Sequence, residues 1–262
     1  MSELLKVPTM AEFMAQGKQP EVLFWVGSAG SYDDRAKKIT KAFVKILNNV
    51  GVDFAVLGTE ESCTGDAAKR AGNEFLFQMQ AVTNIEVLNA YEIKKIVTAC
   101  PHSFNTLKNE YPALGGKYEV YHHTEFIHQL IKNGRLKIRP DAIKGKRITF
   151  HDPCYLGRAN EVYEAPRAIL NALGVELVEM KRSKRSALCC GAGGAQMFKE
   201  SENGDMEINV LRTEDALKTN PGVIATGCPY CNTMMTDGIK FKEKEASIAV
   251  MDIAELVANA QE

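Results

Sequence analysis

The chain has 262 residues, of which 45% are hydrophobic and 25% charged, and its formal net charge is −1. This profile is typical of a soluble globular protein, and the near-zero charge argues against a nucleic-acid or anionic-membrane surface. Its apolar runs are shorter than the roughly 18–20 residues of a membrane-spanning helix, and residues 1–6 lack the profile of a signal peptide. We therefore expect a cytoplasmic protein whose seven cysteines are reduced.

The first half of the chain alternates predicted strands and helices. Thr9 and Glu12 form a capping box that begins a short helix. Apolar runs predict strands at residues 21–26, 52–57, 95–99 and 118–122. Gly27 to Gly30 is expected to turn the chain, and helices are expected at residues 33–50, 66–91 and 125–132, with a candidate break near Thr83 and Asn84.

The second half repeats this order after a basic, aperiodic segment at residues 133–146, which we interpret as a linker with an extended stretch at 136–138. Strands are predicted at residues 147–151, 175–180, 222–226 and 247–251, and helices at 165–173, 206–218, 233–244 and 253–259, the last capped by Asp252. The alternation predicts an α/β fold of two duplicated Rossmann-like lobes, each a mostly parallel sheet flanked by helices. The lobes would span residues 1–139 and 140–262.

Every cysteine falls after a predicted strand, which is where ligand sites form in open parallel sheets. Five of them lie in the second half: Cys154, Cys189, Cys190, Cys228 and Cys231. Adjacent side chains on a regular element point apart, but the glycine-rich stretch after Cys190 would let both sulfurs of the adjacent pair face one point. Thiolate clusters of this kind bind soft metals or iron–sulfur clusters.

The two halves read as an internal duplication. Shifting the first half by 126 residues places Ser28 on Cys154, Cys63 on Cys189 and Thr64 on Cys190. A shift of 128 residues places Cys100-Pro-His-Ser103 on Cys228-Pro-Tyr-Cys231. Hydroxyls, which are poor ligands for soft metals, thus stand at three of the five thiol positions in the first half. We expect a degenerate site in the first lobe and an intact one in the second.

The pattern Cys154 … Cys189-Cys190-Gly191 … Cys228-Pro-Tyr-Cys231 resembles the cysteine-rich CCG domain, as does His151-Asp-Pro-Cys-Tyr-Leu-Gly-Arg158. This domain occurs, usually twice, in the cysteine-rich subunit of heterodisulfide reductase and in iron–sulfur subunits of glycolate and lactate oxidising systems. The resemblance implies a [4Fe–4S] cluster, of non-cubane geometry in some members, held by Cys154, Cys189, Cys190, Cys228 and Cys231. It makes residues 1–139 a degenerate CCG lobe and residues 140–262 an intact one.

The resemblance also implies an electron-transfer subunit of an oxidoreductase. Electrons would come from a flavin-containing dehydrogenase and pass to a ferredoxin-type iron–sulfur subunit or a quinone, because the chain shows no nucleotide, flavin or ferredoxin motif of its own. Partner subunits would supply any attachment to a membrane. Two alternatives stay open: reduction of disulfides or heterodisulfides at the cluster itself, and a zinc-stabilised binding module, although zinc needs only four thiolates.

The remaining thiols, Cys63 and Cys100, have two open interpretations. They are packed as small hydrophobic remnants, or they bind zinc or a reduced cluster with borrowed ligands. The candidates for such ligands are His102, His122 and His123.

Three further features lie near the five thiols. The backbone N–H groups of residues 191–194 are expected to approach the cluster sulfurs and raise the reduction potential. His151 and Asp152 resemble half of a proton relay, but Asp152-Pro153 also fits a turn that aims Cys154. Arg158 and the basic run at residues 181–185 are candidates for the same tuning or for a docking surface, and a solvated loop is the alternative.

Overall fold

The computed structural model describes residues 5–139, 143–201 and 203–261. Its first lobe contains the strands β1 (Val22–Trp25), β2 (Phe54–Ala55), β3 (Lys95–Thr98) and β4 (Glu119–His122). The helices of this lobe are α1 (Met10–Ala15), α2 (Gly27–Tyr32), α3 (Asp34–Asn49), α4 (Asp66–Arg70), α5 (Glu74–Ala90), α6 (Pro101–Asn105) and α7 (His123–Lys132).

The second lobe repeats the arrangement. Its strands are β5 (Arg147–Phe150), β6 (Glu176–Leu177), β7 (Val223–Thr226) and β8 (Ala249–Asp252). Its helices are α8 (Glu164–Ala172), α9 (Ile208–Leu217), α10 (Pro229–Phe241) and α11 (Ile253–Ala258).

The two sheets share one topology. Their strand orders are β2-β1-β3-β4 and β6-β5-β7-β8, and every pairing within them is parallel. Parallel strands joined by helices place all their carboxyl ends at the same edge of the sheet. The predicted α/β fold of two duplicated, Rossmann-like lobes is therefore confirmed.

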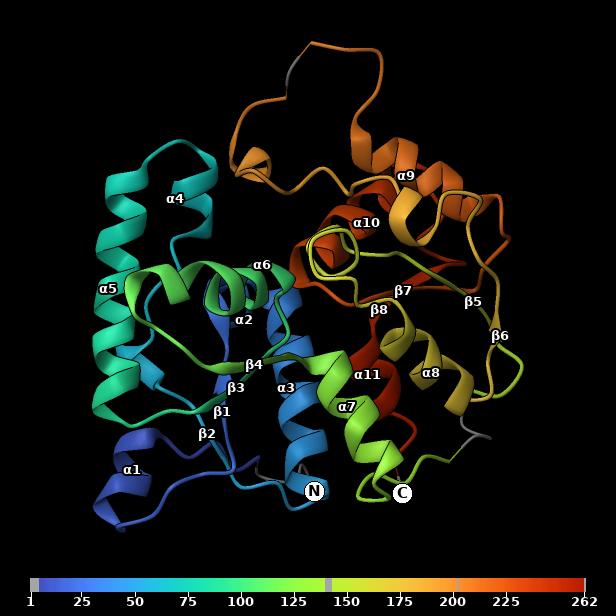
Figure 1. Ribbon diagram of the computed structural model, residues 1–262. Coiled ribbons are helices and arrows are strands. Elements are labelled where there is room, and N and C mark those ends of the chain that lie inside the picture. Colours follow the sequence, from blue (N-terminus) through green and yellow to red (C-terminus); the bar gives the residue numbers. More distant parts are fainter. Residues whose placement is uncertain (1–4, 140–142, 202, 262) are drawn as a thin grey trace.

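The lobes pack through the helices α3, α7, α8 and α11, which lie in the centre of the molecule between the two sheets (Figure 1). One hydrophobic core runs through this contact, from Phe24 and Phe43 of the first lobe to Phe150 and Ile253 of the second. Because burial of apolar surface is the main stabilising term in folding, a core shared in this way holds the relative position of the two sheet edges.

Local sequence signals located most elements but misplaced two. The capping boxes at Thr9 and Asp252 are present as predicted. Gly27 to Gly30 does not turn the chain but lies in α2, and the carboxylate of Glu61 accepts the backbone N–H groups of Val26 and Gly27 at the start of that helix. The break expected near Thr83 lies between α4 and α5 instead, where Gly72 has a positive φ of 87°.

The predicted linker is partly ordered. Leu136 is buried in the shared core, and Ile138 makes an antiparallel bridge to Gln261. The predicted boundary between residues 139 and 140 borders a stretch outside the described residues and stays a prediction. Within the described ranges, no helix combines the length and hydropathy needed to span a bilayer.

Candidate metal centre

Five cysteines meet at the carboxyl edge of the second sheet. Cys154 follows β5, Cys189 and Cys190 lie between β6 and α9, and Cys228 caps α10 directly after β7 with Cys231 in its first turn. Because β6, β5 and β7 are neighbours in the sheet, the three loops converge on one point. The topology thus gathers side chains that are up to 77 positions apart in the chain.

The sulfurs form a continuous set. Thiol–thiol hydrogen bonds link Cys154 to Cys189, Cys189 to Cys190, Cys190 to Cys231 and Cys231 to Cys228. Cys190, Cys228 and Cys231 are buried, whereas Cys154 and Cys189 are half-buried. The structure therefore brings together all five residues that the sequence indicated.

Charge within this set concentrates on Cys189. Hydrogen bonds from Cys154 and Cys190 lower the pKa of the Cys189 thiol, and the backbone N–H of Gly191 adds a bond to its sulfur at 3.3 Å. The same contact with Cys189 raises the pKa of Cys154. Gly191 has a φ of 92°, a conformation that glycine adopts without strain and that other residues rarely adopt. The expected backbone contact with the sulfurs is therefore present at the first glycine of the run.

His151 lies beside the thiols. One of its ring nitrogens and the sulfurs of Cys190 and Cys231 lie within 4.8 Å of one another. Nε of Arg212 donates a hydrogen bond to Nδ1 of His151 at 3.0 Å, so that Nδ1 must act as an acceptor and Nε2 carries the proton. Burial, with help from the Arg212 charge, lowers the pKa of His151 to about 3, which keeps the ring neutral.

Nε2 of His151 is buried and has no hydrogen-bond partner within residues 5–139, 143–201 and 203–261. A protonated ring nitrogen can donate to a sulfur but offers no lone pair to a metal. His151 is thus suited to donate a hydrogen bond to the thiolate set rather than to join it as a ligand.

The equivalent edge of the first sheet holds a small cavity of about 50 Å³. Cys63, Cys100 and His102 line it, together with the three hydroxyl residues that stand where the second lobe has thiols: Ser28, Thr64 and Ser103. The backbone N–H of Gly65 donates to Sγ of Cys63 at 3.5 Å, as Gly191 does for Cys189. Across the described part of the chain, Cys63 and Cys100 belong to no group of three ligand atoms of the kind found around His151.

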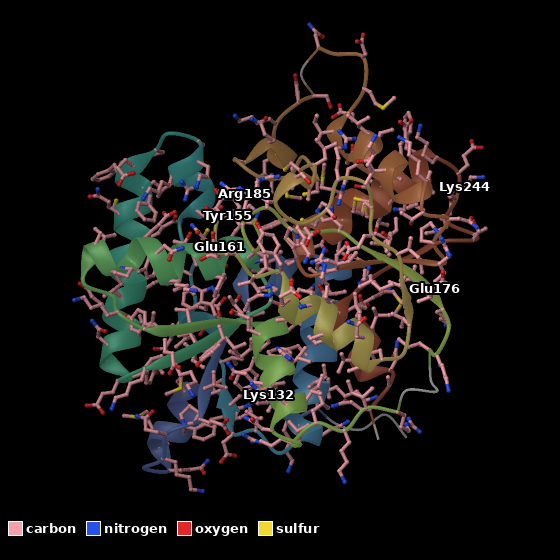
Figure 2. The ribbon with its side chains drawn as sticks, turned by 45° about the vertical axis from the view of Figure 1, so that its right-hand side comes forward. Lys132, Tyr155, Glu161, Glu176, Arg185 and Lys244 are labelled. Carbon is pink, nitrogen blue, oxygen red and sulfur yellow. The ribbon has the colours of Figure 1, made fainter. Side chains whose placement is uncertain are left out.

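Aromatic side chains join the two sites. His102 stacks on Tyr155 with ring centroids 4.4 Å apart and meets Tyr230 edge-on at 5.4 Å. Each tyrosine is next to one of the five cysteines in the sequence, and Nδ1 of His102 is held by Asp66 at 2.9 Å. Figure 2 shows Tyr155 where the lobes meet, far from Lys132 at the end of α7. Residues beside the thiols therefore line the space between the lobes.

Several other candidates have different roles. Asp152 does not pair with His151 but binds Arg167 through both of its oxygens and accepts the backbone N–H of Lys184, as a structural anchor would. Arg158 donates to the carbonyl of Ala187, just before the cysteine pair.

The basic run is partly ion-paired, because Arg182 bonds Asp215 and Lys184 bonds Glu164. Of the three histidines proposed as borrowed ligands, His102 faces the cavity of the first lobe, whereas His122 and His123 hydrogen-bond to each other elsewhere. Sequence reasoning missed Arg212, because an arginine in the middle of an amphipathic helix carries no local signal of its partner.

Comparison with known proteins agrees with this duplicated geometry. The family model described as "Cysteine-rich domain" (CCG) matches residues 22–108 and, again, residues 148–236. The chain belongs to the CCG cysteine-rich domain family. The two CCG matches begin and end at the spacings by which the halves overlay, which confirms the internal duplication.

Curated relatives of this CCG chain are oxidoreductases by name. It is 54% identical over 97% of its length to "Probable iron-sulfur-binding oxidoreductase FadF" of Bacillus subtilis, covering 36% of that protein. It is 46% identical over 94% of its length to "EtfAB:quinone oxidoreductase" of Syntrophomonas wolfei, covering 35% of it. It is 36% identical over 92% of its length to a subunit of the "Dihydromethanophenazine:CoB--CoM heterodisulfide reductase" of Methanosarcina barkeri, covering 59% of that subunit. The chain thus spans about a third of the first two relatives and less than two thirds of the third.

Proposed function

We propose that the second lobe, residues 140–262, binds an iron–sulfur cluster through Cys154, Cys189, Cys190, Cys228 and Cys231. The observation that carries this proposal is the continuous contact among these five sulfurs at one sheet edge. Five thiols exceed the four that a tetrahedral zinc site uses, and iron–sulfur clusters are ligated by cysteine thiolates. The name of the 54% identical relative, an iron–sulfur-binding oxidoreductase, supports the same assignment.

The surrounding residues fit such a group. A cluster carries negative charge, and the half-buried set has donors already aimed at sulfur: the N–H of Gly191 and the free Nε2 of His151. When bound, the cluster would accept and release single electrons. The residues around it would exclude water and stabilise the added charge. We propose a [4Fe–4S] type, with non-cubane geometry as the form that five thiolates favour.

The function that follows is electron transfer within an oxidoreductase. Relatives named for quinone oxidoreduction and for heterodisulfide reduction share this chain as part of a longer protein, which supports a module that relays electrons for different partners. We propose a flavin-containing dehydrogenase as the donor and a ferredoxin-type iron–sulfur centre or a quinone as the acceptor. Reduction of a disulfide directly at the cluster is the second candidate, favoured by the heterodisulfide reductase relative.

For the first lobe, residues 1–139, we propose a degenerate site. Cys63 and Cys100 line a cavity that has room for one or two waters or a single ion. A zinc ion held there with His102 is the alternative, and it would require side chains to move because their ligand atoms are not grouped. Metal analysis of a chain that carries Cys63→Ser and Cys100→Ser separates the two: loss of one equivalent of zinc would favour the zinc site.

Electron transfer is tested by reducing the anaerobically loaded chain and following re-oxidation through its visible absorption. We expect rapid re-oxidation by one-electron acceptors and none by disulfides in the absence of partner subunits. Turnover of a disulfide by the chain alone would favour the reductase, and a colourless, zinc-containing chain would favour the binding module.

A further inference from the structure

A buried chain of hydrogen bonds crosses from one lobe to the other beneath the thiol set. Nδ1 of His122 meets Oγ1 of Thr124 at 2.7 Å, Nε2 of His122 meets Nδ1 of His123 at 3.2 Å, and Nε2 of His123 meets Oδ1 of Asp252 at 2.8 Å. All four side chains are fully buried. His122 and Asp252 are equivalent residues of the duplication, because each ends the last strand of its sheet and caps the helix that follows.

This chain touches the backbone of both candidate sites. A Cβ on Gly227 would lie 3.5 Å from Cε1 of His122, and Gly227 immediately precedes Cys228. The His122 ring also hydrogen-bonds the backbone of Ala99, which immediately precedes Cys100. The histidine pair therefore lies one backbone residue away from a proposed cluster ligand, where charge on the cluster acts through a dry interior.

The hydrogen bonds admit two states that differ by one proton. With His123 neutral, Thr124 donates to His122, His122 to His123, and His123 to Asp252. With His123 doubly protonated, it donates to both Asp252 and His122, and His122 donates to Thr124. Every heavy-atom contact is the same in the two states, so a proton enters or leaves by reversing hydrogen bonds without repacking the core.

The charge of the unit differs between these states. Oδ1 of Asp252 accepts a second bond from the N–H of Ala254, but Oδ2 is buried and has no hydrogen-bond partner among the described residues. Without the extra proton the unit carries a buried carboxylate charge, and with it the unit is neutral. Burial, together with the neighbouring His123, lowers the pKa of His122 well below its usual range, which assigns the extra proton to the His123–Asp252 half.

Four helices supply the other groups that face the unit. Glu125 of α7 accepts the backbone N–H of His122, and Glu255 of α11 accepts that of Asp252. Glu255 is itself paired with Arg35 of α3 at 2.7 Å, which offsets its charge. The ring faces are covered by Phe43 of α3 and Phe104 of α6. The thiols of Cys100 and Cys228 lie beyond Ala99 and Gly227, so the second of these connects the unit to the proposed cluster.

We propose that the His122–His123–Asp252 unit is a redox-linked proton site, which binds one proton when the cluster gains one electron and releases it on re-oxidation. The electron comes from the donor of the proposed function and the proton from solvent, so that the pair of events adds one hydrogen equivalent and no net charge. The proposal rests on the proposed function. Its physical basis is linkage: a site that binds a proton more tightly in the reduced state raises the potential at low pH and lowers it at high pH.

The test is the midpoint potential of the loaded chain from pH 6 to pH 9, followed by visible absorption. We expect a potential that falls with pH over part of this range, with a slope approaching 59 mV per pH unit, the value for tenfold in a one-electron couple. His123→Gln, which keeps a donor toward Asp252 but does not titrate, should flatten the slope. Asp252→Asn, which preserves a good helix cap, should do the same. His128→Gln, on the same helix α7, is the matched control and should retain the slope.

A second readout uses the unmodified sequence. Redox-difference infrared spectra of protein carrying ring-labelled histidine should contain bands of a histidine that gains a proton on reduction. A pH-independent potential, or the wild-type slope in His123→Gln or Asp252→Asn, would overturn the proton site while leaving the cluster assignment intact. Absence of histidine bands would do so as well, and absence of iron and sulfide would overturn both proposals.

Discussion

Arg212 donates a hydrogen bond from Nε to Nδ1 of His151 at 3.0 Å, and both side chains are fully buried. This contact sets the tautomer of the imidazole and leaves its other N–H free to face the sulfurs of Cys190 and Cys231. The first lobe has no equivalent arrangement among its described residues, which agrees with a cluster in the second lobe alone.

Removing the His151 donor should therefore lower the reduction potential of the cluster. His151→Leu takes away an N–H that stabilises the more negative, reduced state, and we expect a shift on the order of 60 mV to lower potential. His151→Gln supplies an amide donor of similar reach and should recover most of the shift. Redox titration monitored by EPR measures both variants, and equal potentials in His151→Leu and the wild type would contradict the assigned role.

The two lobes should respond differently to loss of a cysteine. Cys190→Ser removes a buried thiol from the centre of the linked set, and we expect loss of most of the iron. Cys63→Ser changes a half-buried thiol beside the cavity of the first lobe and should retain iron at the wild-type level. Iron and acid-labile sulfide analysis after anaerobic purification compares them, and equal losses would show that the halves have not diverged.

These outcomes bear on how far the sequence could lead. The five thiols were predictable because each follows a strand, and neighbouring parallel strands bring their carboxyl ends together whatever the details of packing. Arg212, Glu61 and the stacking of Tyr155 on His102 were not, since each contact joins segments far apart in the chain. The helix α2 was read as a turn for the same reason: local glycines favoured a turn, and a carboxylate 34 residues away binds its first N–H.

Glu61 should make stability depend on pH. Burial raises its pKa to about 7, against the bonds from Val26 and Gly27 that favour the charged form, and its usual value is 4.5. Between these two values the folded chain binds more protons than the unfolded chain, so stability falls as pH rises through this window, by up to about 1.4 kcal/mol per pH unit. The free energy of unfolding of the metal-free chain at pH 5, 6, 7 and 8 measures this slope.

Glu61→Gln should remove that contribution, so that its stability changes less with pH than the wild type's. Glu60→Gln, a substitution at the exposed neighbouring position, serves as the control and should follow the wild-type slope. If Glu61→Gln kept the full slope, Glu61 would not be the group responsible.

The contact between α9 and α10 should tolerate no side chain at Gly238. A Cβ at this position would collide with Oγ1 of Thr213 and lie 3.1 Å from the carbonyl oxygen of Asn209. Gly238→Ala should destabilise the chain by about 1–3 kcal/mol, as overpacking of a close contact does. Gly204→Ala, where a Cβ meets open space, is the control. Urea unfolding compares the two, and equal midpoints would mean that α9 and α10 move apart at little cost.

The central claim is that loops from three places in the second lobe hold one iron–sulfur cluster between their thiolates. Its most direct test is the iron and acid-labile sulfide content of the anaerobically purified chain, measured with its visible and EPR spectra. The account predicts equal amounts of iron and sulfide, equivalent to one [4Fe–4S] cluster per chain, and their loss on Cys190→Ser. A chain that contains one tightly held zinc and no sulfide would contradict it.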